Sequence, residues 1–208
     1  MIIGMTTAEN DIIENLAVTL FDIGAIRFGK FKRHNGKTSH IYLDLRVLVS
    51  YPQALRQVTA VYRSILDNIQ FDVLAATPLA GLPLGTALSL DMDKPLIYPR
   101  KTAKSYGTGK GIEGAWSVGH TAVVIDDLIA SGNSVLQTIV SLKVAGLQVQ
   151  DAVVLLDREQ TGVVNLAEQG YKLHAISPIS RILSILEAKE LATPKQVNKA
   201  LKSLRKNL

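Results

Sequence analysis

The chain has 208 residues, of which 47% are hydrophobic and 20% are charged, and this composition is typical of a globular protein with a full core. It contains no cysteine, which excludes disulfides and thiolate metal sites and fits a cytoplasmic location. No apolar run reaches the roughly 18 residues that a membrane span needs, and the N-terminus lacks the pattern of a secretory signal. We therefore expect no contact with membranes.

The formal net charge of +5 is concentrated near the C-terminus. Residues 193–208 contain five basic side chains and no acid, and they are predicted to form a basic C-terminal helix. Such a run is typical of a solvated helix face, so the charge does not predict a nucleic-acid-binding protein. A nucleic-acid partner stays an alternative that depends on this segment alone.

Hydrophobic periodicity predicts helices and strands that alternate along most of the chain. The N-terminal part is expected to contain a helix over 8–26, a strand hairpin within 27–46 and a helix over 52–68. Further strands are predicted at 71–76, 95–101, 121–126, 149–159 and 171–177, and further helices at 84–90, 134–146, 162–170 and 179–191. This order predicts a single α/β domain, residues 1–208, with a mostly parallel central sheet flanked by helices.

Four polar loops are predicted to follow strands of this sheet. They are the segments 77–81, 99–111, 126–134 and 157–162. Ligands of open parallel sheets bind outside the carboxyl ends of the strands. We therefore expect these four loops to converge on one binding edge.

The third loop begins with the adjacent acids Asp126 and Asp127 and continues with the small, polar residues 130–134. Carboxylates accept hydrogen bonds from sugar hydroxyls and bind hard cations. A glycine turn at the start of a helix presents backbone amides to an anion. Together they predict a site for a sugar phosphate, and the alternative is an ordinary strand end followed by a helix N-cap.

The second loop is rich in glycine and basic side chains. Arg100, Lys101, Lys104 and Lys110 precede its first acid, Glu113. Its glycines match the letters of a dinucleotide-binding pattern. That pattern must lie between a strand and a helix, whereas a turn and a strand are predicted to follow here. We interpret residues 100–118 as a mobile basic flap that closes on a polyanion, and the alternative is a solvated loop.

The fourth loop contributes Arg158. A guanidinium at a strand end can hold a planar anion through two parallel hydrogen bonds. The alternative is an ion pair with the neighbouring Asp157 or Glu159.

These segments together resemble the type I phosphoribosyltransferases, and within them the orotate phosphoribosyltransferase family and the transferase half of uridine monophosphate synthases. The likeness runs from about residue 28 to 187. Its specific parts are residues 28–46, 100–114, 123–138 and 155–162. The resemblance implies the fold of that family, with an N-terminal helix and small hood within about residues 1–50, a parallel sheet and a catalytic flap.

The resemblance also implies a reaction and its participants. Phosphoribosyl pyrophosphate (PRPP) and orotate would give orotidine 5′-phosphate and pyrophosphate, with Mg²⁺ held mainly by PRPP. A homodimer would share the flap across its interface, and a decarboxylase of orotidine 5′-phosphate would be a partner. The implied catalytic residues are Lys104, Asp126 and Asp127. PRPP would also contact Arg100, Lys101, Ile129, Ala130, Ser131, Gly132, Asn133 and Ser134, and orotate would contact Arg158, Ala130 and His34.

The chain departs from the family pattern at several positions of this implied site. They are His34, His40, Leu79, Ala80, Ser105 and Ala130, and they cluster where the base and the pyrophosphate would lie. Two alternatives therefore stay open beside the orotate enzyme. One is a phosphoribosyltransferase for another nucleobase, and the other is a non-catalytic regulatory protein that binds PRPP.

Overall fold

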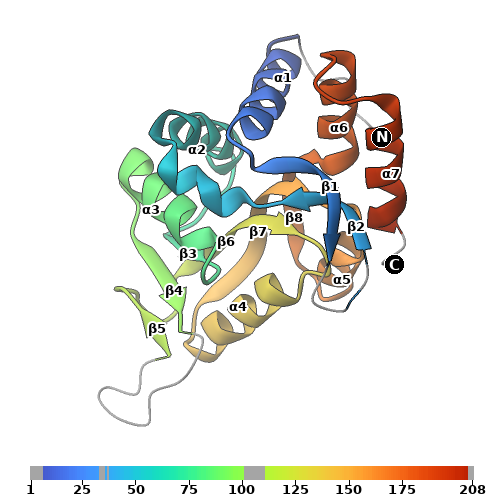
Figure 1. Ribbon diagram of the computed structural model, residues 1–208. Coiled ribbons are helices and arrows are strands. Elements are labelled where there is room, and N and C mark those ends of the chain that lie inside the picture. Colours follow the sequence, from blue (N-terminus) through green and yellow to red (C-terminus); the bar gives the residue numbers. More distant parts are fainter. Residues whose placement is uncertain (1–6, 33–35, 37, 101–110, 206–208) are drawn as a thin grey trace.

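The computed structural model describes residues 7–32, 36, 38–100 and 111–205 (Figure 1). Within these ranges the predicted alternation of strands and helices is confirmed. In the same part of the chain, no helix combines the length and the apolar character that a membrane crossing requires.

A six-stranded sheet forms the centre of the molecule, in the order β5-β4-β3-β6-β7-β8. Its strands are β3 (Val73–Ala76), β4 (Leu96–Pro99), β5 (Ile112–Glu113), β6 (Thr121–Ile129), β7 (Gln148–Asp157) and β8 (Lys172–Pro178). Every neighbouring pair is parallel except β4 and β5. The prediction of a mostly parallel sheet is correct, and the short antiparallel edge strand β5 is an addition that hydrophobic periodicity did not indicate.

Helices cover both faces of this sheet, as parallel sheets require. Leu74, Val123 and Val153 belong to a buried cluster with residues from α1, α2, α3 and α6, whereas Ala75 and Val124 belong to a second cluster with residues from α4 and α5. The helices are α1 (Thr7–Asp22), α2 (Pro52–Leu66), α3 (Gly81–Met92), α4 (Asn133–Val144), α5 (Gly162–Glu168) and α6 (Ile179–Ala188). Alternate residues of each strand therefore pack into different layers.

A separate antiparallel hairpin, β1 (Ile26–Lys32) and β2 (Thr38–Leu43), lies above one end of the main sheet (Figure 1). We call this two-stranded sheet the hood. The predicted hairpin within 27–46 is confirmed, but its second strand ends at Leu43 because the chain turns into a 3₁₀ helix, η1 (Leu45–Ser50). The C-terminal helix α7 (Pro194–Arg205) packs against both strands of the hood.

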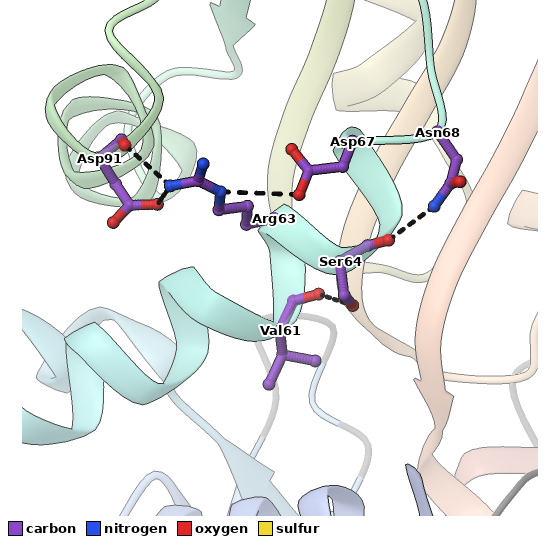
Figure 2. A network of polar contacts seen from close by, with 6 residues as sticks. All are labelled: Val61, Arg63, Ser64, Asp67, Asn68 and Asp91. Carbon is purple, nitrogen blue, oxygen red and sulfur yellow. Dashed lines mark hydrogen bonds and ion pairs between the residues drawn. The ribbon is translucent and has the colours of Figure 1, made fainter.

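Arg63 joins the end of α2 to α3, as Figure 2 shows. Its Nη1 atom lies 3.0 Å from the carbonyl oxygen of Asp91 and 3.1 Å from the Asp91 carboxylate, and its Nε atom lies 3.6 Å from the carboxylate of Asp67. These groups are exposed, and exposed ion pairs contribute little to stability. The network therefore orients the helix ends, while the buried clusters stabilise the fold.

Candidate functional site

Asp126 and Asp127 lie inside β6, with exposed fractions of 5% and 9%. The sequence predicted a strand over 121–126 that ends at the acid pair, whereas β6 continues to Ile129. The strand continues because the backbone of Leu128 and Ile129 still pairs with β7. The pair therefore stands on the rigid sheet, near the carboxyl end of a central strand.

Each carboxylate of the pair accepts a backbone hydrogen bond. Asp127 N donates to Asp126 Oδ1 at 2.9 Å, and Leu128 N donates to Asp127 Oδ1 at 2.8 Å. A carboxylate can accept several hydrogen bonds. Both acids are thus held in place with acceptor capacity left for a ligand.

Burial governs the ionisation of the pair. It raises the pKa of Asp126 well above the usual range, and the charge of Asp127 raises it further. Burial also raises the pKa of Asp127, against which a backbone hydrogen bond and the positive charge of Arg46 act. A ligand that donates hydroxyl groups or carries a cation would favour the ionised forms.

The loop that follows β6 leads into α4. Gly132 adopts a left-handed φ of 81°, and α4 begins at the next residue. The first backbone amides of a helix lack partners within the helix and attract anions. Ile129 and Gly132 are buried, Ala130 and Ser131 are half-buried, and Asn133 and Ser134 are exposed, so the first residues of α4 are accessible at the surface.

The start of α5 supports this loop, a contact that the sequence did not predict. Gly162 N donates to the carbonyl oxygen of Ala130 at 2.8 Å, and Asn165 Nδ2 donates to that of Ser131 at 2.9 Å. A Cβ atom on Gly162 would lie 2.9 Å from the Ala130 oxygen and 2.5 Å from Ile129. The only sequence signal was the pair Thr161-Gly162 at the start of a helical pattern.

The loop after β3 lies beside the same acids. Thr77 N donates to the carbonyl oxygen of Ile125 at 2.9 Å, and a hydrogen bond from Thr77 lowers the otherwise raised pKa of Asp126. The peptide bond Pro78–Leu79 is cis, and the Leu79 side chain is 64% exposed. The sequence placed the 77–81 loop at the same edge as the acid pair, and the structure adds the hydrogen bond of Thr77.

Arg158 follows β7 and faces the hood. Its backbone N donates to the carbonyl oxygen of Ile129 at 2.9 Å. Its side chain lines a cavity of about 310 Å³ together with six hood residues, Phe31, Lys32, Ser39, Ile41, Tyr42 and Leu43. The neighbouring acids accept backbone hydrogen bonds: Asp157 from Glu159 N at 2.8 Å, and Glu159 from Ser180 N at 2.7 Å.

Arg100 stands where β4 ends, at the base of the predicted flap. Its Nη1 atom forms an ion pair with Glu113, and its backbone N donates to the carbonyl oxygen of Gly111 at 2.9 Å. These contacts and the β4–β5 pairing bring the two described ends of the flap together. The other basic or polar residues singled out by sequence, Lys101, Lys104, Ser105 and Lys110 of the flap and His34 of the hood, lie outside the described residues.

Comparison with known proteins identifies the family. Residues 48–168 match the model of the phosphoribosyl transferase domain. A bifunctional enzyme PyrF/PyrE from Nostoc is 41% identical over 86% of this chain and 38% of the relative. An orotate phosphoribosyltransferase from Pyrobaculum aerophilum is 37% identical over 80% of this chain and 87% of the relative. The structure of UMP synthase from Leishmania donovani matches 93% of this chain and 42% of that chain, with a TM-score of 0.85 and 37% identity.

The chain belongs to the phosphoribosyl transferase family and, within it, to the group that contains the orotate phosphoribosyltransferases. This confirms the resemblance drawn from the four sequence segments. The chain spans about two fifths of the length of the Nostoc and Leishmania proteins.

Proposed function

We propose that the chain transfers the phosphoribosyl group of PRPP to orotate and releases pyrophosphate. The observation that carries this proposal is the placement of Asp126 and Asp127 directly before the Gly132 turn and the start of α4. Vicinal hydroxyls suit the buried acids, and a 5′-phosphate suits the backbone amides of residues 129–134. One ligand that carries both groups is a ribose 5-phosphate.

Orotate, in this proposal, binds in the cavity between the hood and Arg158. The guanidinium supplies a planar donor for a carboxylate or carbonyl, and Phe31 and Tyr42, whose ring centroids lie 5.4 Å apart, supply aromatic surface. Arg158 also donates through its backbone N to the carbonyl oxygen of Ile129, the first of residues 129–134, which we call the phosphate loop after its proposed ligand. This hydrogen bond would hold the orotate cavity next to the site of the sugar phosphate. His34 and Ala130 stay proposed contacts of the base from the sequence alone.

The reaction breaks the bond between C1′ and the pyrophosphate oxygen and forms a bond between C1′ and N1 of orotate, whose N1 proton passes to solvent or to the departing pyrophosphate. The leaving oxygen keeps the bonding electron pair, so negative charge grows on pyrophosphate while positive charge grows on the ribose. Fixed cations aimed at the leaving group stabilise this transition state more than the ground state. We assign that role to Lys104, with Lys101 and Arg100 as further contacts of pyrophosphate.

Magnesium is proposed to accompany the pyrophosphate. Among residues 7–32, 36, 38–100 and 111–205, no group of three or more His, Cys, Asp or Glu side chains could hold a metal ion. The acid pair, with its oxygen donors, fits a hard cation that keeps other ligands. When bound with PRPP, the ion would supply charge neutralisation on the phosphate oxygens, and the acids would contact the ribose.

The orotate family also suggests the partners. We propose a homodimer in which the flap of one subunit serves the site of the other, and a decarboxylase that consumes the product. The flap proposal is supported by the two β strands and the Arg100–Glu113 ion pair that hold its base at the sheet edge.

An assay of orotate consumption tests the proposal. The protein is mixed with PRPP, Mg²⁺ and orotate, and the loss of orotate absorbance is followed together with the release of pyrophosphate. The expected result is equal consumption of orotate and release of pyrophosphate. Pyrophosphate release with adenine or hypoxanthine in place of orotate would assign another base, and PRPP binding without turnover would indicate a regulatory protein.

A further inference from the structure

The two walls of the Arg158 cavity belong to different parts of the fold. The hood strands β1 and β2 form their own sheet, which shares no strand pairing with the six-stranded sheet among the described residues. Arg158 follows β7 of the large sheet. The separation of the two walls therefore depends on the contacts that join the hood to the Arg158 loop.

The last turn of α7 contacts both walls through consecutive residues. Gln160 of the Arg158 loop donates from Nε2 to the carbonyl oxygen of Leu204 at 3.1 Å. His40 of β2 donates from its backbone N to Oγ of Ser203 at 3.2 Å. Ser203 in turn donates to the carbonyl oxygen of Ala200 at 2.8 Å, which fixes its hydroxyl on the helix.

The two residues of this turn that make these contacts are buried. Ser203 is 7% exposed and Leu204 is 3% exposed. Val197, Ala200 and Leu204 pack in the same hydrophobic cluster as Ile26 and Ile41 of the hood. The basic side chains of α7 at 195, 199, 202 and 205 are exposed, so the amphipathic pattern turns its apolar face toward the hood.

We propose that α7 positions the acceptor cavity, with Gln160 and Ser203 as positioning residues that hold the Arg158 loop and β2 at a set separation. This inference rests on the proposed function in one respect, namely that orotate occupies this cavity. It assigns to the C-terminal helix a role in the affinity for orotate, whereas PRPP is proposed to bind at the acid pair of β6. The basic surface of the helix is not needed for this role.

Kinetics of matched variants test the inference. Gln160→Met keeps the length of the side chain and removes its donor, and Ser203→Ala removes the hydroxyl. Each variant should raise the KM for orotate about 5- to 10-fold, the effect of one lost hydrogen bond, while the KM for PRPP stays unchanged. Ser203→Thr, which keeps a hydroxyl, should restore orotate affinity, and Lys202→Gln, on the exposed face of the same turn, should behave as wild type.

A second measurement keeps the inference testable if a variant folds poorly or if the wild type does not consume orotate. Hydrogen exchange should become faster in residues 38–43 for Ser203→Ala and in residues 158–161 for Gln160→Met, with β6 unchanged. The positioning role would be overturned if the KM for PRPP rose as much as the KM for orotate and kcat fell. Unchanged hydrogen exchange in both 38–43 and 158–161 would also overturn it. Absence of orotate turnover in the wild type would instead overturn the proposed function, and exchange alone would then decide whether α7 couples the two walls.

Discussion

The hydroxyl of Tyr62 donates a hydrogen bond of 2.6 Å to the main-chain carbonyl of Asp126. Tyr62 lies on α2 and is fully buried, and burial together with the nearby acids raises the pKa of its phenol well above 10. The phenol therefore stays protonated and serves as a permanent donor. Through this bond α2 holds the backbone at the point where β6 presents its acid pair.

Tyr62→Phe should lower both stability and turnover. The substitution keeps the ring but leaves a buried carbonyl without its donor, which costs about 1–3 kcal/mol. Urea unfolding should report that loss of stability, and steady-state kinetics should show a lower kcat. Tyr171→Phe is the control, since the Tyr171 hydroxyl has only a 3.4 Å contact with Lys143 at the surface. Equal stability of the two variants would show that the Tyr62 hydrogen bond contributes nothing.

Gly162→Ala should weaken PRPP binding. Its Cβ atom would lie 2.9 Å from the Ala130 carbonyl oxygen, so the phosphate loop must shift, and overpacking of this kind costs about 1–3 kcal/mol. Gly170→Ala provides the comparison, because Gly170 has a φ of 82° with open space around it and the variant stores about 1 kcal/mol of backbone strain far from the loop. Calorimetric titration with Mg²⁺-PRPP should show weaker binding for the first variant alone, and equal affinities would contradict the support that α5 gives the loop.

The stability of the free protein should fall as the pH rises from about 4. Burial raises the folded-state pKa of Asp126 above the unfolded value of about 3.9. In that window the native state binds more protons than the unfolded state, so the free energy of unfolding decreases with pH until the folded-state pKa is passed. Urea unfolding between pH 4 and 8 measures the slope. Asp126→Asn should remove part of the decline, and an identical slope in the variant would show that Asp126 is not its source.

Arg158→Lys should weaken orotate binding although the charge is kept. Lysine cannot present two parallel donors to a planar anion, and the loss of a charge-assisted hydrogen bond is about 1.5–3 kcal/mol, or roughly 10- to 100-fold in affinity. The KM for orotate should rise by that factor while the KM for PRPP is unchanged. A rise in the KM for PRPP alone would place Arg158 at the sugar phosphate.

Mixing two inactive variants tests the shared flap. Lys104→Ala should lower turnover by on the order of 10²–10³, and Asp126→Asn should impair the sugar site. If the flap serves the neighbouring subunit, a mixed dimer contains one site with both intact residues, so activity should reappear after the variants are mixed and allowed to exchange subunits. Persistent inactivity in a mixture whose subunits have exchanged would mean that each flap serves its own site.

Much of this fold could be predicted because local patterns and tertiary structure agree. The alternating strands and helices from Val73 to Ala188 follow apolar periodicity, and the order of elements then favours a parallel sheet. The end of the strand that carries the acid pair could be predicted only to within a few residues, because it depends on pairing with β7 and not on local composition. The short β5 has two residues, too few for a periodic signal.

The contacts that position the site could not be predicted. In the sequence, Tyr62 is one of several residues that fit the buried face of α2. Only the fold brings its hydroxyl to Asp126, 64 residues away. The same holds for Asn165, which reaches the phosphate loop from another helix, and for Ser203, which meets His40 across 163 residues. Such contacts depend on the packing of elements that are distant in sequence, and local patterns carry no information about it.

A crystal structure with bound PRPP and Mg²⁺ tests the central claim most directly. The expected result is a ribose whose hydroxyls lie within hydrogen-bond distance of Asp126 and Asp127, with the 5′-phosphate on the amides of residues 131–134. A ligand bound elsewhere, with the acids and the Gly132 turn untouched, would contradict the account.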